Sequence, residues 1–407
     1  MVIVVRAGRY IDGTGADPRR DVNLHIDGTT IVKVGGDAPR DATVIDRSEQ
    51  TVMPGMIDCH VHLISNPSSL EERIQKPYSF LVAEALKNAR TTLEAGFTTV
   101  RDAAGTPRGV KQAIERGLFP GPRLRIAVGA LSQTGGHGDA RFPSGVDLRV
   151  PHPEHPLTVV DGVEPARKVT RELLRAGADQ IKVMTSGGVL SPSDEPGATG
   201  FSPEEIAAIV YEAHAAGKTV MSHAQALQGI RNAVEAGVES IEHGIYLDED
   251  TAELMKKKGT YLVPTLVAPL WVTRLAERKP GMMPAYAVRK AEEVIETHQK
   301  MFTMATKIGV LIAMGTDTGV GEHGTNAEEL ALMVKLGMTP MQAIVATTKT
   351  AAACARLGKL TGTLEVGKRA DVVAVAGDPL ADIAVLQQAE RITLVMRDGQ
   401  VFKQLAD

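Results

Sequence analysis

The sequence predicts an α/β protein, made of a (β/α)8 TIM barrel and a small β-sandwich domain built from both chain ends. Three observations lead to this prediction. Both ends of the chain read as short strands between turn signals. Through the middle, helical segments alternate with β-rich segments. Histidines and one aspartate stand where several of the central strands end, and barrels carry their chemistry at these strand ends.

The two ends of the chain are rich in β-branched residues, interrupted by turn dipeptides such as Asp12-Gly13 and Asp27-Gly28. The predicted strands are 1–7, 21–26, 30–34, 42–46, 362–364, 370–375, 391–397 and 400–402. Pairing the two sets is the simplest arrangement. It gives one small β-domain of residues 1–53 and 359–407, beside a barrel of residues 54–358.

In the middle of the chain a helical segment repeatedly ends in a small residue and glycine, and a strand follows within a few residues. Ala95-Gly96 before 98–102 is one case and Ala216-Gly217 before 219–223 is another. Glycine suits the left-handed position that ends a helix. The predicted strands are the one that carries His60, then 98–102, 124–130, 180–184, 219–223, 240–243, 261–264 and 310–317. Helices are expected over 81–93, 164–175, 203–216, 226–235, 285–306 and 340–357. This alternation favours a parallel barrel over an open doubly wound sheet.

The composition excludes several classes of function. Net charge is −4 and aromatic residues make up 3% of the chain, with no long basic run, so nucleic acid is not an expected partner. No apolar run approaches the ~20 residues that span a bilayer, and the N-terminus shows no signal-peptide pattern. The two cysteines, Cys59 and Cys354, do not suggest a disulfide framework. These features predict a cytoplasmic protein with no membrane partner.

The first barrel strand carries two histidines one residue apart. On a strand, residues i and i+2 face the same side, so His60 and His62 would present two imidazoles together. Imidazole is a common metal ligand, although this pair alone is equally compatible with two ordinary histidines near a turn. His223, His243 and Asp317 end later strands. Together the five residues predict a metal centre at the barrel mouth.

Lys182 lies inside the apolar strand 180–184, where a lysine is rarely buried without a partner. It could form a salt bridge inside the barrel, or a Schiff base with a carbonyl substrate. A third interpretation fits best beside four histidines and an aspartate. A lysine carboxylated by CO₂ becomes an anionic carbamate, which can bridge two cations.

These six residues, in this strand order, resemble the binuclear metal centre of the amidohydrolase superfamily. The resemblance extends over nearly the whole chain, including 54–62 and the tail 362–371. Segments 181–189 and 240–244 are similar to the imidazolonepropionase-related group, which contains prolidase-like dipeptidases and carboxypeptidases. Imidazolonepropionase itself uses a single metal and does not need the lysine of the fourth strand.

The resemblance implies two divalent ions, zinc by default with Mn, Co or Fe as alternatives, and Lys182 as N6-carboxylysine. The implied ligands are His60, His62 and Asp317 for the more buried ion, His223 and His243 for the second, and Lys182 for both. A metal-bridging hydroxide would attack an amide carbonyl. Asp317 would accept its proton and pass it to the leaving nitrogen.

Substrate contacts are expected mainly from loops. His137 corresponds to a loop histidine that contacts the substrate carbonyl in relatives and could donate a hydrogen bond to the oxyanion; the alternative is a surface histidine. The long loop 131–163 is expected to be a lid or binding segment. Dipeptidase relatives often carry a carboxylate-binding aromatic where this chain has Gln225, which could instead hydrogen-bond a carboxylate or carbonyl. Tyr246, Arg141 and His323 are further candidates, or else solvated loop residues.

The sequence therefore predicts a metal-dependent amidohydrolase that cleaves the amide C–N bond of a dipeptide or an N-acyl amino acid, including bulky or xenobiotic amides. A cyclic-amide hydrolase or a deaminase of the same superfamily is the alternative. A barrel retained as a binding module is the non-enzyme alternative, and such a protein would be expected to lose ligands. A small-molecule amide is the expected partner. Because many relatives assemble, a homo-oligomer is also expected.

Overall fold

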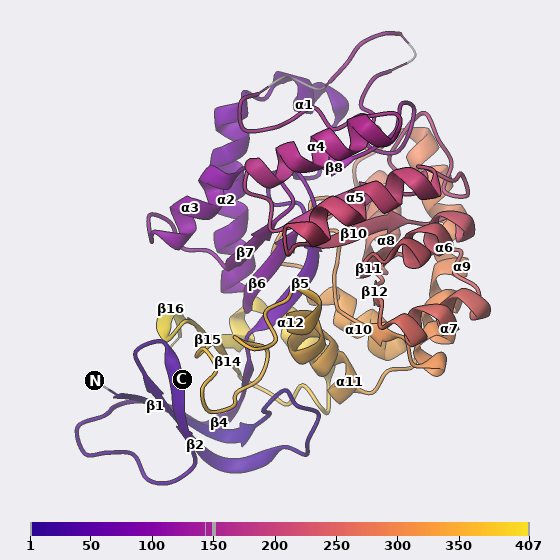
Figure 1. Ribbon diagram of the computed structural model, residues 1–407. Coiled ribbons are helices and arrows are strands. Elements are labelled where there is room, and N and C mark those ends of the chain that lie inside the picture. Colours follow the sequence, from indigo (N-terminus) through magenta and orange to yellow (C-terminus); the bar gives the residue numbers. More distant parts are fainter. Residues whose placement is uncertain (1, 143, 149–151, 406–407) are drawn as a thin grey trace.

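The computed structural model describes residues 2–142, 144–148 and 152–405, and within them it has an α/β fold with two parallel sheets and one mixed sheet (Figure 1). The predicted α/β class with parallel sheets is confirmed. The strand order of the mixed sheet is β16-β15-β14-β4-β1-β2-β3. Its strands are β1 (Val2–Tyr10), β2 (Arg19–Asp27), β3 (Thr30–Val34), β4 (Thr43–Pro54), β14 (Val372–Val375), β15 (Ile392–Arg397) and β16 (Gln400–Gln404).

Strands from both chain ends pair in this mixed sheet. β4 lies between β1, to which it is parallel, and β14, to which it is antiparallel with Met53 opposite Val373. Figure 1 marks both chain ends at this sheet. Alternate side chains such as Leu24 and Leu394 are buried in one apolar cluster, as expected for strands with one face on a core. The packing of two sheets into a sandwich stays a prediction.

The predicted strand 362–364 is wrong. Gly362 adopts a left-handed φ of 95°, so the chain turns there instead of extending. Leu364 nevertheless binds the N-terminal segment, because its N–H donates to the carbonyl oxygen of Asp12 at 2.9 Å.

The two parallel sheets hold the strands predicted for the middle of the chain. The first consists of β5 (Met56–Val61), β6 (Phe97–Asp102) and β7 (Arg123–Ile126). The second, in the order β13-β12-β11-β10-β9-β8, consists of β8 (Ala130–Leu131), β9 (Gln180–Met184), β10 (Thr219–Ala224), β11 (Ser240–His243), β12 (Tyr261–Val263) and β13 (Leu311–Ile312). Hydrogen bonds also run between the sheets. The Cys59 N–H donates to Met314 O at 2.9 Å, and the Asp179 N–H donates to Ile126 O at 2.7 Å.

Two predicted strands differ from the structure. The range 124–130 is divided into β7 and β8, because Val128 has a positive φ of 66° that interrupts the strand. The range 310–317 is regular only over β13. Beyond it the chain still bonds to neighbouring strands, but Asp317 has a φ of 62°, which no extended strand allows.

Helices cover the parallel sheets (Figure 1). Those predicted are α2 (Tyr78–Glu94), α4 (Val163–Arg175), α5 (Pro203–Ala215), α6 (Leu227–Ala236), α9 (Ala285–Ile308) and, for 340–357, α11 (Pro340–Val345), a π-helical turn (Ala346–Thr350) and α12 (Ala351–Cys354). The structure also contains α1 (Leu70–Gln75), α3 (Arg108–Glu115), α7 (Glu249–Lys258), α8 (Val267–Arg278) and α10 (Glu328–Lys335). Of these, α7 ends at Gly259 ahead of the predicted strand 261–264, as the repeated helix–glycine–strand pattern predicts. Among the described residues, no helix combines the length and apolar character that crossing a membrane requires.

The mixed sheet continues directly into the parallel sheets. Only Gly55 separates β4 from β5, and its N–H donates to Asp371 O at 2.9 Å. A Cβ at this position would lie 2.1 Å from Thr98 Oγ1, so the close approach requires glycine. Arg123 of β7 then pairs with Asp371 at 2.6 Å and with Asp398 at 2.7 Å. The parallel sheet that contains His60 is thereby fixed to the mixed sheet.

Candidate metal centre

Five histidine rings form a row where the parallel strands end. Ring centroids are 5.5 Å apart for His62 and His60, 5.1 Å for His60 and His243, 4.7 Å for His243 and His223, and 4.1 Å for His223 and His137. The row spans β5, β10, β11 and the loop after β8. Residues far apart in the sequence therefore converge on one place.

Asp317 joins the row at the His62 end. Its Oδ1 lies 3.2 Å from His62 Nε2 and 3.4 Å from His60 Nε2. His60, His243 and Asp317 offer ligand atoms that all lie within 4.8 Å of one another. The structure thus brings together a His/Asp group of the kind that holds a divalent ion.

Each of the four histidines predicted as ligands has one ring nitrogen beside a partner that accepts a hydrogen bond. The contacts are His60 Nδ1 to Glu242 Oε2 at 2.7 Å, His62 Nδ1 to Ala104 O at 3.0 Å, His243 Nδ1 to Thr265 Oγ1 at 2.6 Å and His223 Nε2 to Gly187 O at 3.0 Å. A neutral imidazole that donates from one nitrogen has a lone pair on the other. Metal-binding histidines show this arrangement, so the donor set fits divalent cations.

Burial favours the neutral form of His60, His223 and His243, whereas for His62 burial is outweighed by the hydrogen bond to Asp317 and its charge, which raise the pKa. Burial lowers the pKa of His60 to about 4, with a further contribution from the charge of Lys182. Burial also lowers the pKa of His223 and of His243 well below the usual range. For Asp317, burial acts in the opposite direction, but the neighbouring His60 and His62 hold the pKa of this carboxyl well below its ordinary value.

Lys182 lies on β9, opposite Met221 of β10, and its side chain is fully buried. Burial lowers its pKa to about 8, because the charged ammonium loses its hydration. Its charge also contributes to the lowered pKa values of His60 and His243. The lowered pKa increases the share of the neutral amine, which is the form that reacts with CO₂.

A buried ionic network stands behind His60. The Arg101 guanidinium donates to Glu242 Oε1 at 2.9 Å and to Ser240 Oγ at 3.0 Å. Although burial opposes the shift, Arg101 and His60 lower the pKa of Glu242 to about 2. Glu242 is therefore an anion that orients the His60 ring.

The backbone is strained at three strand ends of the site. His243, Thr265 and Asp317 have φ values of 71°, 52° and 62°, in the left-handed region that non-glycine residues rarely adopt. Such strain is concentrated at functional sites, where the surrounding structure holds it. Here the left-handed backbone lies at His243, at its hydrogen-bond partner Thr265 and at Asp317, so it affects how these three side chains are oriented in the site.

His137 extends the row from the loop after β8. Its ring stacks on that of His223 with an interplanar angle of 12°, and its Nδ1 lies 2.8 Å from Ser191 Oγ. Burial lowers its pKa to about 4. The expectation of a surface loop histidine therefore does not describe this residue.

The four residues predicted as further substrate contacts differ in burial and in their partners. Gln225 follows β10, is buried, and its Oε1 has no hydrogen-bond partner among the described residues. Tyr246 is partly exposed and its N–H donates to Gln225 O at 2.9 Å. His323 Nε2 lies 2.9 Å from Ser65 O, which joins the loops after β5 and β13. Arg141 is exposed on the long loop, of which residues 143 and 149–151 lie outside the described part.

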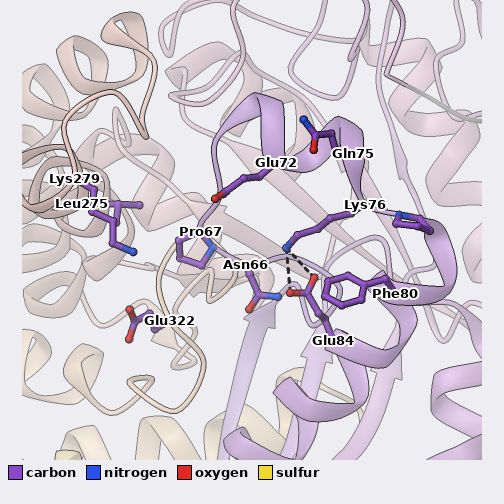
Figure 2. Close-up of a pocket in the computed structure, with 11 residues that line it drawn as sticks. Asn66, Pro67, Glu72, Gln75, Lys76, Phe80, Glu84, Leu275, Lys279 and Glu322 are labelled. Atoms are coloured by element: carbon purple, nitrogen blue, oxygen red, sulfur yellow. Dashed lines mark hydrogen bonds and ion pairs between the residues drawn. The ribbon is translucent and has the colours of Figure 1, made fainter.

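A pocket of about 630 Å³ opens beside the loops that follow His62 and Asp317 (Figure 2). Asn66 and Glu322, from these two loops, line it together with Phe80 of α2 and Leu275 of α8, which lie on opposite sides in Figure 2. Lys76 binds Glu84 at 3.0 Å on the side of the pocket where Phe80 lies, as Figure 2 shows. Its described lining contains none of the six predicted ligands, so the pocket adjoins the histidine row without including it.

The residues that orient the histidines, including Glu242, Arg101, Thr265 and Ser191, were not among the predicted site residues. Charged side chains inside apolar strands were a usable signal for Glu242 and Arg101, since such residues are rarely buried without a partner. Thr265 and Ser191 are ordinary polar residues whose roles depend on tertiary contacts.

The chain is similar to several known proteins. The sequence profile of the Amidohydrolase family matches residues 51–402. Ochratoxinase from Aspergillus niger is 37% identical over 99% of this chain and 87% of its own length. Imidazolonepropionase from Pseudomonas fluorescens is 26% identical over 88% of this chain and 87% of its own length. The crystal structure of a Xaa-Pro dipeptidase with methionine bound in its active site superposes with a TM-score of 0.91 and 34% identity, covering 99% of this chain and 100% of that one.

Proposed function

Because this chain belongs to the amidohydrolase family, we propose that it is a metal-dependent amidohydrolase that cleaves the amide C–N bond of a dipeptide or an N-acyl amino acid. The observation that carries the proposal is a set of four histidines. Each has one ring nitrogen in a hydrogen bond and the other left with a lone pair, and Asp317 lies beside two of them, His60 and His62. The similarity to ochratoxinase and to a Xaa-Pro dipeptidase supports this substrate class.

We further propose that the two parallel sheets close into one (β/α)8 barrel of residues 54–358, with the small β-domain of residues 1–53 and 359–407 beside it. The hydrogen bonds from Cys59 to Met314 and from Asp179 to Ile126, one on each side of the β5–β7 sheet, support the closure. In such a barrel the histidine row lies at the carboxyl ends of the strands, where barrel enzymes have their active sites.

The residues present would hold two divalent cations. In the proposal, His60, His62 and Asp317 hold one, His223 and His243 hold the other, and Lys182 as a carbamate bridges them. Zinc suits this set of imidazole and carboxylate ligands. When bound, the cations polarise the carbonyl of the substrate and lower the pKa of water.

The side chains then have distinct roles. Asp317 accepts the proton of the attacking water and passes it to the leaving nitrogen, since an amine leaves poorly without a proton. His137, stacked on His223, contacts the reacting amide. Gln225, whose buried Oε1 has no hydrogen-bond partner among the described residues, takes the place of the aromatic residue of many relatives and hydrogen-bonds a carboxylate or carbonyl of the substrate through its amide N–H.

The variable group of the substrate would extend into the pocket of Figure 2, whose walls continue the loops after His62 and Asp317. Phe80 and Leu275 provide apolar surface there, which suits a bulky amide. Tyr246, Arg141 and His323 remain proposed substrate contacts.

Two measurements test the proposal. Metal analysis of the purified protein, before and after incubation with Zn²⁺ and bicarbonate, should give two ions per chain. A screen of Xaa-Xaa dipeptides, N-acyl amino acids and cyclic amides should release free amino acid from one of the first two groups. Protein that acquires no metal would refute the binuclear centre, and hydrolysis of cyclic amides alone would favour the alternative function.

Lys182→Ala tests the carbamate. This variant should lose most of its metal and its activity, because the bridge between the ions is gone. Lys257→Ala is the control, since Lys257 is exposed near the end of α7. Equal metal content in the two variants would exclude a bridging role for Lys182.

A further inference from the structure

A buried lysine holds the loop that follows β9. Lys290 of α9 has a relative exposure of 1%, and its ammonium donates to Gly188 O at 3.2 Å, to Ser191 O at 2.9 Å and to Asp194 O. Three hydrogen bonds from one buried cation fix the backbone of this loop. Ser191 and Asp194 therefore occupy defined positions next to His137.

Within this loop, one serine hydroxyl lies between a carboxylate and an imidazole. Ser191 Oγ makes a short hydrogen bond with Asp194 Oδ1 and lies 2.8 Å from His137 Nδ1. Asp194 Oδ1 also accepts a hydrogen bond from the Gly188 N–H at 3.0 Å. An ionised carboxylate can only accept, so the single hydrogen of Ser191 points to Asp194. The oxygen of Ser191 must then accept a hydrogen bond from His137 Nδ1–H.

We propose that Ser191, oriented by Asp194, is a positioning residue that holds neutral His137 in the tautomer with its proton on Nδ1. Nε2 of His137 then carries the lone pair. The ring has little freedom to turn over, because it stacks on His223 and lies against Gly188, where an added Cβ would be 2.3 Å from its Cε1. The hydrogen-bond chain and the packing therefore specify the same orientation.

This arrangement determines what His137 can do for the reaction, and that part of the inference rests on the proposed function. Neutral Nε2 accepts a hydrogen bond from a substrate N–H or from water. It donates to a developing oxyanion only after it has taken up a proton. These hydrogen bonds also exclude Ser191 as a nucleophile. Its hydroxyl donates to the Asp194 carboxylate and not to His137, which would have to act as its base.

Nitrogen NMR of the full-length, zinc-loaded protein tests the tautomer directly. The protein is labelled with ¹⁵N-histidine, and a His137→Gln sample identifies the signals of His137. At near-neutral pH the wild type should show a protonated Nδ1 and an unprotonated Nε2. Ser191→Ala should shift the population toward the Nε2–H form, whereas Ser193→Ala, an exposed position in the same loop, should leave it unchanged.

Two results would overturn the inference. One is a wild-type His137 with its proton on Nε2, and the other is a folded Ser191→Ala protein, by thermal denaturation, that keeps the wild-type tautomer. Kinetics add a second readout. Ser191→Ala should lower kcat on the order of 100-fold with little change in KM, and Ser191→Thr, which restores the hydroxyl, should recover part of it. Unchanged kcat in Ser191→Ala would exclude a role for the tautomer in the reaction.

The NMR result does not depend on any substrate. If the wild type hydrolyses no amide but shows the Nδ1–H tautomer and its loss in Ser191→Ala, the proposed function fails and the positioning role stands. If the wild type hydrolyses an amide but His137 carries its proton on Nε2, the positioning role fails and the proposed function stands.

Discussion

The carboxylate of Glu242 accepts a hydrogen bond from His60, with Oε2 of the glutamate 2.7 Å from Nδ1 of the histidine and both side chains buried. Glu242 immediately precedes His243 in β11, and its other oxygen binds Arg101 at 2.9 Å. One strand therefore provides a candidate ligand and, next to it, the group that orients a candidate ligand on another strand.

Glu242→Gln should weaken metal binding about 10- to 100-fold. The amide has one accepting oxygen where the carboxylate has two, so either His60 or Arg101 faces an NH₂ group. Zinc affinity can be measured by competition with a chromogenic chelator. Glu249→Gln, an exposed position at the start of α7, is the control and should bind like the wild type. Equal affinity in the two variants would contradict an orienting role for Glu242.

Lys290→Met should lower the free energy of unfolding by about 2–3 kcal/mol, because three backbone carbonyls in a buried loop lose their donor. Chemical denaturation measures this change. Lys300→Met lies on the same helix, α9, at an exposed position whose ion pair is with Glu296, and should change stability by less than about 0.5 kcal/mol. If both variants were equally stable, the loop would not depend on Lys290.

Glu329 should make the protein less stable as the pH rises from about 5 to 8. Burial raises the pKa of this carboxyl from 4.5 to about 8, although it accepts hydrogen bonds from the N–H groups of Leu266 and Val267. Between these values the folded protein binds a proton that the unfolded chain has released, so the free energy of unfolding falls with rising pH.

Glu329→Gln, which resembles the protonated acid, tests this pH dependence. The variant should match the wild type near pH 5 and should lose less stability toward pH 8, as thermal denaturation across the range will show. Glu328→Gln, at the neighbouring position that pairs with Arg274, should keep the wild-type slope. Parallel curves for wild type and Glu329→Gln would mean that Glu329 is already ionised in the folded protein at pH 5.

Phe80→Ala should raise KM for bulky amides several-fold and leave kcat nearly unchanged, because the side chain lines the pocket beside the histidine row without reaching the reacting atoms. Phe119→Ala is a matched control. The two phenylalanines are 50% and 49% exposed, and Phe119 lies after α3, outside the lining of this pocket. A lower kcat with unchanged KM would place Phe80 in another role.

The sequence predicted the parts of the fold that depend on local pattern. Helix ends marked by glycine, such as Gly237 after α6 and Gly309 after α9, adopt the expected left-handed conformation. Pairing of β4 with β14 was also predictable, since strands at the two chain ends had no other obvious partners. His60, His62, His223, His243 and Asp317 come together at one place, and their role as ligands stays a prediction.

The irregular strand end and the residues that orient the histidines could not be predicted, because they depend on tertiary contacts that no local sequence pattern encodes. Propensity does not anticipate that the predicted strand 310–317 is regular only over β13, or that Asp317 at its end adopts a left-handed conformation. The choice of Glu242 as the partner of His60 requires two strands far apart in the sequence to be in register around Arg101. Likewise, the position of Ser191 depends on Lys290, a residue about a hundred positions away that reads as one more charge on a solvated helix.

The central place of β4 in the mixed sheet sets a limit on the order of events during protein synthesis. One edge of β4 pairs with β1 and the other with β14, which begins only at Val372. A nascent chain can therefore complete every βα unit before the second edge of β4 is covered. Because Gly55 alone separates that strand from β5, the backbone that carries His60 gains the support of β14 only after this strand has left the ribosome.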